Sequence, residues 1–467
     1  MVCPSRLSLF GKIRLRRFCG LELRCRPAKA RLCRPASVGL LLCVLVAPAT
    51  FAQGALPLPY QAGGKHLGVA TCASSVCHGA VSPSTKYDIS LNEYVTWSHD
   101  DKHSKAYLVL SNEKGRAIAA KLGIADARTD KLCLDCHTDN VPAARRGPKF
   151  TFADGVSCEA CHGGAESWLE SHSSRKVTYR QNVERGMYPT ADLVSRASLC
   201  LSCHYGNEDK FATHRIMGAG HPRLSFELDT FVALQPAHHQ VDADYRKRKP
   251  AHDHAQIWAY GQLAALRSQL SMLQSPLATS SPVFPELALF SCHSCHGNPI
   301  GKLDWTRGLF TKYADPGAVP LDDSHLKMAW AVLSQTDRGA AQNLLSLGQE
   351  LQEAAGEGRE RIASTSLQLL RVVGQALQET QSRRWAREDY SRMLGELLRL
   401  GAGGEFRDYA SAEQAVMAVE LLMIDIGSAD RFRKQLDELY EILRDEDGYR
   451  PPRLVEAMKR LSATLRT

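Results

Sequence analysis

The feature that most constrains this chain is a short pattern in which two cysteines, separated by two residues, are followed at once by a histidine. It occurs four times, at residues 133–137, 158–162, 200–204 and 292–296. The segment from Cys72 to His78 repeats it with four residues between the cysteines. The chain has 15 cysteines, of which five precede residue 50 and the other ten all lie in these five motifs. Any fold for residues 70–300 must therefore place five sets of two cysteines and one histidine so that the three side chains of each set can act together.

This spacing is typical of covalent haem attachment. Two thiols one helical turn apart can add to the two vinyl groups of one haem, and the adjacent histidine then lies under the iron as an axial ligand. Zinc sites, dithiol redox motifs and disulfides use similar thiol spacings, but none of them requires a histidine after the second cysteine. Histidine makes up only 17 of the 467 residues, so five cysteine pairs each followed by histidine would rarely occur by chance. The five histidines therefore favour haem over the other kinds of site.

The sequence therefore predicts five covalently bound haems c. The cysteines expected to bind the cofactor are Cys72, Cys77, Cys133, Cys136, Cys158, Cys161, Cys200, Cys203, Cys292 and Cys295. The histidines expected to ligate the iron from these motifs are His78, His137, His162, His204 and His296.

Each iron has a second axial position, and twelve further histidines are available for it. The preferred candidates are His103, His172, His214 and His221. His172 follows a motif histidine by ten residues, and His221 follows a Gly-Ala-Gly turn that would suit the approach of backbone to a flat cofactor. His103 lies four residues after His99, so we expect the two to share one face of a helix.

The remaining candidates are weaker. They are His99, His238, His239, His252, His254 and Met217, whereas His66, His293 and His325 are the least suitably placed. Histidine ligation on both sides of every iron and one open iron are both compatible with this inventory.

The net charge of +8 comes from the start of the chain. Residues 1–52 contain ten Lys or Arg and one acid, and the rest of the chain holds 48 basic and 49 acidic residues. The basic stretch precedes an apolar run, Val38 to Ala47, and the small-residue segment that ends at Ala52, which is the arrangement of a secretory signal peptide. We expect cleavage after Ala52 and export to the periplasm, and no charge-driven contact with nucleic acid. No later segment approaches the roughly 20 apolar residues of a transmembrane helix.

The expected fold is mainly α. A pentahaem cytochrome c domain at 53–313, with little regular structure beyond helices, is followed by an α-helical domain at 314–467. From about Asp322 the chain lacks cysteine, and its leucines and valines recur at helical spacing, which predicts a bundle of about six helices. Ser411 to Gln414 fits a capping box at a helix start, Pro451 opens the last helix, and residues 255–273 are expected to be helical.

The motifs, together with residues 97–107, 155–164 and 214–226, resemble the cytochrome c554-like multihaem cytochromes, in the same superfamily as hydroxylamine oxidoreductase and pentahaem nitrite reductase. The resemblance covers roughly residues 65–300. It implies a helical haem domain with stacked and perpendicular haem pairs, mostly bis-histidine ligation and periplasmic electron transfer. By the same resemblance, His103 and His172 match positions of second axial histidines.

The chain departs from that family in two ways. Its first motif has the longer spacer, and it has five motifs rather than the four of cytochrome c554. It also lacks the C-x-x-C-K motif by which pentahaem nitrite reductases place lysine on the catalytic haem, which puts nitrite reduction by that mechanism in doubt.

Three functional hypotheses follow. The favoured one is an electron carrier that works between redox partner proteins, with peripheral contact to membrane quinol-oxidising proteins. The second is an oxidoreductase that acts on a small nitrogen or sulfur compound at one five-coordinate haem. The third is an adaptor whose helical tail docks a redox enzyme.

Overall fold

The computed structural model describes residues 56–84, 89–279, 284–296, 308–315 and 318–465, and this part of the chain is built from helices. Within these ranges there is no β-strand, only two isolated bridges, His66 with Arg146 and Phe290 with Leu321. The mainly α fold is therefore confirmed. The proposed signal peptide, residues 1–52, lies outside the described residues.

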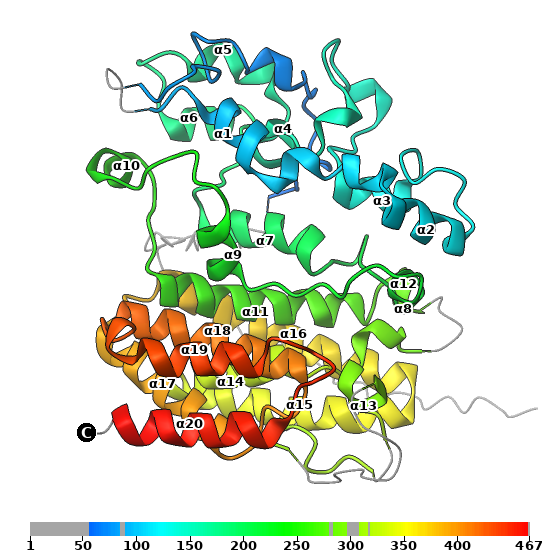
Figure 1. The fold of residues 1–467 in the computed structure, drawn as a ribbon, viewed down its shortest axis with the longest axis vertical. Coiled ribbons are helices and arrows are strands. Elements are labelled where there is room, and N and C mark those ends of the chain that lie inside the picture. The colour runs from blue at the N-terminus through cyan, green and yellow to red at the C-terminus, as the bar shows by residue number, and fades with distance from the viewer. Residues whose placement is uncertain (1–55, 85–88, 280–283, 297–307, 316–317, 466–467) are drawn as a thin grey trace, which may run out of the picture. The chain divides into compact units, whose positions relative to one another are not determined.

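Short helices make up the part of the chain that carries the motifs (Figure 1). They are α1 (Glu93–Asp100), α2 (Glu113–Leu122), α3 (Lys131–His137), α4 (Cys158–His162), α5 (Leu169–His172), α6 (Tyr179–Glu184), α7 (Leu193–His204), α8 (His214–Gly218), α9 (Leu228–Leu234), α10 (Ala243–Arg248), α12 (Pro276–Thr279) and α13 (Cys292–His296). Between them lie 3-10 turns such as η2 (Lys102–Lys105). These helices have 12 residues or fewer and are marginal in isolation, so tertiary contacts or a cofactor must hold them.

One expectation for this region is wrong. His99 and His103 do not share a helix, because α1 ends at Asp100 and His103 lies in the separate turn η2. The backbone of Asp101 is extended (φ −83°, ψ 122°), and its carboxylate accepts a hydrogen bond from the His103 amide. That cap starts a new turn and points His103 in another direction.

Seven helices follow residue 322, close to the six expected. They are α14 (Ser324–Thr336), α15 (Arg338–Glu357), α16 (Arg359–Ser382), α17 (Arg387–Ala402), α18 (Tyr409–Asp425), α19 (Arg433–Ile442) and α20 (Pro451–Leu465). As expected, Pro451 opens the last helix. The helix expected from Ser411 begins earlier, because Asp408 rather than Ser411 caps α18 and accepts a hydrogen bond from the Ser411 amide.

The long helix α11 (His254–Met272) belongs to the bundle by its contacts, although it precedes the last motif. Figure 1 shows it beside α14, α16 and α18, against which it packs. Most of its 19 residues are buried, and Trp258 and Leu263 are fully buried. A helix that is apolar on all sides belongs in a core. The domain boundary at 313 and 314 stays a prediction, with α11 packed across it.

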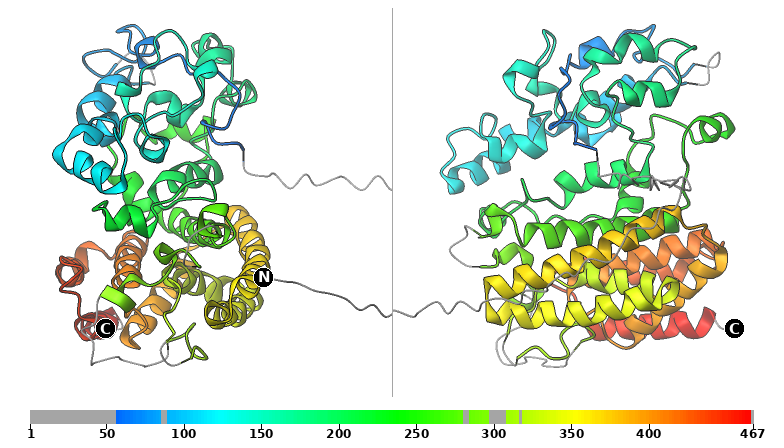
Figure 2. Two further views of the ribbon diagram at one scale, coloured as in Figure 1. Left: turned by 90° about the vertical axis from the view of Figure 1, so that its right-hand side faces the viewer. Right: turned by 180° about the vertical axis from the view of Figure 1, so that it is seen from behind.

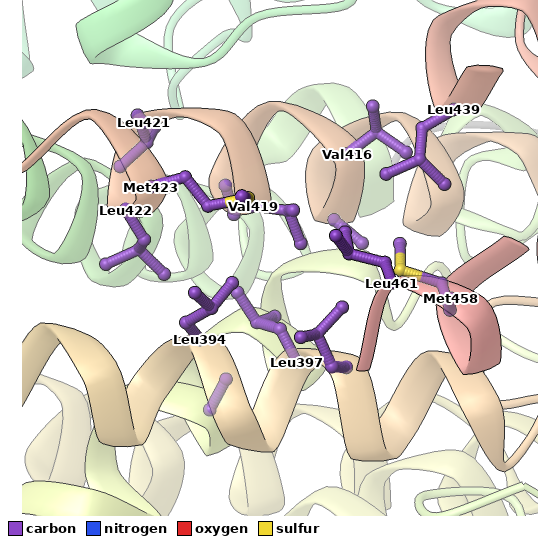
Figure 3. Packing of buried hydrophobic residues seen from close by; sticks show 14 of the residues in the cluster. Leu394, Leu397, Val416, Val419, Leu421, Leu422, Met423, Leu439, Met458 and Leu461 are labelled. Carbon is purple, nitrogen blue, oxygen red and sulfur yellow. The ribbon is translucent and has the colours of Figure 1, made fainter. Parts of the chain in front are cut away.

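Two large apolar clusters form the interior of the bundle, and the second extends to Leu193 of α7 and Leu228 of α9. Figure 3 shows one of them, where Leu394 and Leu397 of α17 face Val419 of α18 and Leu461 of α20. The other surrounds α15 and α16, which run side by side (Figure 2) and are joined at Gly358. No described helix is long and apolar enough to cross a membrane.

Candidate functional site

The five motifs are named sites 1 to 5 in chain order, after His78, His137, His162, His204 and His296. At sites 2 to 5 a helix ends on the motif histidine, so the two cysteines lie one turn apart on α3, α4, α7 and α13. Side-chain caps fix two of these helices. Asp130 accepts from the Leu132 amide at 2.8 Å, and Asp192 accepts from the Ser195 amide at 2.9 Å. At site 1 the longer spacer forms a non-helical turn closed by the Cys77 amide on the Ser74 carbonyl.

All ten motif cysteines are free thiols, and none forms a disulfide. Cys77 and Cys295 are exposed, and the other eight are partly buried. The sulfur atoms are therefore available for thioether bonds. Within the described residues, no group of three or more His, Cys, Asp or Glu side chains could hold a metal ion by itself.

Each motif histidine instead faces one other histidine ring. The pairs, with their ring-centroid separations, are His78 with His172 (6.1 Å), His137 with His221 (6.3 Å), His162 with His238 (6.3 Å), His204 with His103 (5.7 Å) and His296 with His214 (6.3 Å). The separations fall in a narrow range, 5.7–6.3 Å, in all five pairs, which indicates that the pairs have the same function.

The separation fits an iron between the rings. When two imidazole nitrogens bind one iron from opposite faces, each about 2 Å from the metal, the ring centroids lie about 6 Å apart. Two rings in van der Waals contact would stack at about 3.5–4 Å. At site 4 the two Nε2 atoms are 3.5 Å apart, which is within about 0.5 Å of the spacing that one iron requires. Each site therefore has two thiols and two opposed imidazoles, the donor set that haem c takes from a protein.

The ring planes separate the pairs into two classes. The two rings are nearly parallel at site 1 (14°) and site 5 (25°). They are nearly perpendicular at sites 2, 3 and 4, with interplanar angles of 86°, 86° and 88°.

The four preferred second histidines, His103, His172, His214 and His221, each lie opposite a motif histidine. The fifth, His238, was only a weak candidate because the sequence offered no way to separate it from the adjacent His239. His239 stacks on Tyr245 at 5.5 Å instead. His99 is exposed, and the buried His66 and His325 bond to Asp139 and Gln262.

Local backbone explains how the second histidines are presented. Thr213 caps α8, which begins at His214, and Gly220 has a φ of 115° that turns the chain before His221. A side chain at position 220 would strain that left-handed turn. His172 ends α5 and lies edge-on against the buried ring of Trp168 at 5.3 Å.

In several of these histidines, Nδ1, the ring nitrogen that points away from the opposite ring, makes a hydrogen bond. Nδ1 of His103 bonds to the Asp101 carboxylate (2.8 Å) and Nδ1 of His78 to that of Glu93 (2.9 Å). His137, His221 and His172 bond to backbone carbonyls of Ala106 (2.9 Å), Pro222 (2.8 Å) and Leu169. Because a carbonyl or carboxylate accepts, these bonds place the proton on Nδ1 and leave the Nε2 lone pair for a metal.

Electrostatics also differ among the sites. The Asp101 hydrogen bond outweighs burial and raises the pKa of His103, and Glu93 raises that of His78 in the same way. Burial, with smaller contributions from His238 and Lys249, lowers the pKa of His162 to about 3, so this ring is neutral at pH 7. Burial likewise lowers the pKa of His204 and of His238.

The contacts between sites give their order in space. The thiols of Cys72 and Cys158 lie close enough to shift each other's pKa, as do those of Cys136 and Cys203, so site 1 adjoins site 3 and site 2 adjoins site 4. Burial raises the pKa of the Cys161 thiol, and Cys200 and Cys203 lie close enough to raise it further, which links site 3 to site 4. Sites 2 and 5 draw their second histidines from one short segment, residues 214–221.

Comparison with known proteins agrees with this geometry. Residues 71–163 match the family model described as cytochrome c554 and c-prime, a segment that holds the first three motifs and His103. No curated protein and no solved structure matched the chain. The resemblance beyond residue 163 stays a prediction. Over residues 71–163 the chain is therefore similar to the cytochrome c554 family, and this similarity supports a c-type cytochrome that binds haem c covalently and takes part in electron transfer.

Proposed function

We propose that this protein is an exported electron carrier that holds five haems c in one continuous chain of redox centres. The ten motif cysteines would bind the porphyrins, and the five histidine pairs would ligate the irons from both faces. When bound, each haem supplies a one-electron ferric/ferrous couple. The polypeptide positions these centres, excludes water from them and sets their reduction potentials through ligands, hydrogen bonds and burial.

One observation carries the proposal: each of the five motif histidines faces a second imidazole at 5.7–6.3 Å. An iron with two strong protein ligands has no free position for a substrate. It can accept and release electrons with little change in geometry, as a carrier requires.

The neighbouring contacts support a single path for electrons, in the order site 1, site 3, site 4, site 2, site 5. Cysteine contacts join the first four sites, and residues 214–221 join the last two. The exposed cysteines, Cys77 and Cys295, belong to the two terminal sites. We therefore assign electron uptake and release to sites 1 and 5, where partner proteins can approach the haem edge.

The alternative, an oxidoreductase that acts on a small nitrogen or sulfur compound, needs an iron with one protein ligand. The paired rings weigh against it, since a second histidine would have to leave an iron before substrate could bind. Export to the periplasm and exchange of electrons with redox partner proteins, including membrane quinol-oxidising proteins, are parts of the proposal that rest on the sequence.

Two measurements on the oxidised protein test the carrier proposal. Mass spectrometry should give the polypeptide plus five haems, and the electronic spectrum should be low-spin and unchanged by cyanide, nitrite or hydroxylamine. Fewer haems, or a high-spin band that shifts with one of these ligands, would contradict the proposal.

The adjacent residues His238 and His239 provide a test variant and a matched control for the ligand assignment at site 3. His238→Ala should convert one haem in five to a high-spin, ligand-binding form, because His162 loses its opposite ring. His239→Ala should leave the spectrum low-spin, since that ring stacks on Tyr245. Equal spectra for the two variants would remove His238 from the ligand set.

A further inference from the structure

A pocket beside Cys292 lies where the motif region meets the helical bundle. Met217 and Arg223 line it from the segment after His214, and Asp408 from the start of α18. Asp322, Gln269 and Glu446 also line it. This places bundle residues next to Cys292 of site 5, and it puts three carboxylates there.

Asp322 and Asp408 belong to a charged cluster inside the bundle. The buried ammonium of Lys327 contacts Asp323 at 2.6 Å and Asp408 at 3.5 Å, and it donates a hydrogen bond to Ser411 at 3.2 Å. Ser411 in turn donates to Asp408 at 2.7 Å. Asp322 bonds to the Ser324 amide at 2.9 Å and has no cation within 4 Å among the described residues. Lys327 thus contacts two of the three carboxylates, and Asp322 is the carboxylate without a cation partner in this cluster.

A second observation points to a proton donor in this pocket. Gln269 is 4% exposed, and its side-chain nitrogen donates to the backbone carbonyl of Asp322 at 2.7 Å. Its side-chain oxygen accepts no hydrogen bond in the described part of the chain. A buried acceptor left without a donor costs about 1–3 kcal/mol, so the pocket favours a group that brings a hydroxyl proton to it.

The electrostatics agree with the geometry. Burial, reinforced by the charge of Asp408, raises the pKa of Asp322. Burial also raises the pKa of Asp323 to about 6 despite Lys327. For Asp408, Lys327 and Ser411 outweigh burial and lower the pKa. Asp322 is therefore the carboxyl of the cluster whose charge is least compensated, and it interacts with Cys292.

Building on the proposed function, we propose that Asp322 takes up one proton when the haem at site 5 receives one electron. A reduced donor protein supplies the electron, which converts ferric to ferrous iron. Water supplies the proton, and the Asp322 carboxylate becomes a neutral carboxylic acid. No bond to iron changes, and the pocket gains no net charge. Reduction at this end of the haem chain is thereby linked to proton uptake.

Asp323, the other buried carboxyl with a raised pKa, differs from Asp322 because it contacts the Lys327 ammonium at 2.6 Å. The titratable and charged groups around it are Asp323, Lys327, Asp408, Cys292, His293, Tyr205, Arg223, Tyr409 and Glu446. Arg223 is held by Glu413 at 3.1 Å and Glu446 at 3.2 Å. Burial lowers the pKa of His293 and raises that of Tyr205, so neither changes charge near pH 7.

Spectroelectrochemical titration of the full chain from about pH 5 to 9 tests the link. In the unaltered protein, one of the haem potentials should fall as pH rises, by up to a tenfold change in the equilibrium constant per pH unit, or about 59 mV for one electron. Asp322→Asn keeps an acceptor for the Ser324 amide and should remove this dependence. Asp244→Asn, an exposed carboxylate paired with Arg248, should keep it. A dependence that survives in Asp322→Asn would overturn the proposal.

Infrared difference spectra of the unaltered protein give a test that needs no variant. Reduction should produce the carbonyl band of a protonated carboxylic acid, and its absence would overturn the proposal. Haem mass and spin state measured on the same sample separate the two ideas. Fewer than five low-spin haems would contradict the proposed function, whereas five haems with potentials independent of pH would contradict only the role of Asp322.

Discussion

At the scale of single residues, the five histidine pairs differ most in what holds the far side of each ring. A carboxylate that accepts from Nδ1 makes the imidazole a stronger electron donor than a carbonyl does, and so stabilises ferric iron. Carboxylates accept the Nδ1 hydrogen bond of His103 and His78, whereas backbone carbonyls accept that of His137, His172 and His221. The same ligand set can therefore give a range of potentials.

Replacing one carboxylate should change one potential. Asp101→Asn weakens the partner of His103 while keeping its shape, so the potential of the haem at site 4 should rise by tens of millivolts, where about 59 mV corresponds to 1.4 kcal/mol for one electron. Spectroelectrochemistry measures the shift. Asp126→Asn, whose exposed carboxylate pairs with Arg128, should leave all potentials unchanged. An unchanged potential in Asp101→Asn would show that the carboxylate does not tune the iron.

The sequence identifies residues of this site well where the motif is local and poorly where the choice depends on folding. Each motif fixes two cysteines and a histidine within a few residues. The second histidines come from as far as about a hundred residues away, as His103 does for His204. His238 and His239 are chemically identical neighbours, and only the path of the backbone decides which one faces His162.

At the scale of helices, hydrophobic periodicity was a reliable guide in the bundle, and caps were less so. The leucine spacing predicted α15 to α18, but α18 begins two residues before Ser411 because Asp408 is its cap and accepts from the Ser411 amide. Near the motifs, α1 stops where Asp101 caps a new turn. Local hydrogen bonds of this kind need coordinates, since Asp, Ser and Asn can each cap from several positions.

Packing on these helices gives a stability prediction. Leu397 of α17 is fully buried in the cluster of Figure 3. Leu397→Ala should therefore cost about 2–5 kcal/mol and lower the midpoint of thermal unfolding measured by circular dichroism. Leu367→Ala on α16, where the side chain is 49% exposed, should stay within about 0.5 kcal/mol. Equal losses would mean that α17 is not part of the core.

The contact between α9 and α11 predicts that the stability of the fold depends on pH. His254 on α11 bonds to Asp229 on α9 at 2.9 Å, and this bond raises the pKa of the half-exposed His254 to about 9. A raised histidine pKa adds stability that is complete below its unfolded value, near 6.5, and is lost as the pH rises through 9.

Urea unfolding of the unaltered protein and of His254→Gln at two pH values tests this dependence. The variant should be less stable at pH 6 by about 1 kcal/mol or less, given its exposure, and equal at pH 10. His99→Gln, an exposed histidine, serves as the control and should match the unaltered protein at both values. A deficit in His254→Gln that persists at pH 10 would contradict the ion pair.

At the scale of the whole molecule, the motif region and the bundle are joined along α11 and beside the last site. Arg223 bonds to Glu413 and Glu446, the Ala255 amide bonds to Asp425, and α11 packs among the bundle helices. This favours a structural and electrostatic role for the bundle at site 5 over the role of an independent adaptor. The two sites with parallel rings, 1 and 5, are also the ends of the proposed electron path.

Electron paramagnetic resonance of the fully oxidised protein tests the central claim, that every iron lies between two histidines. Parallel imidazole planes split the iron orbitals strongly and give rhombic low-spin spectra, whereas perpendicular planes give highly anisotropic ones. The ring angles predict two haems of the first kind and three of the second. A high-spin ferric signal equivalent to one haem or more would contradict the claim.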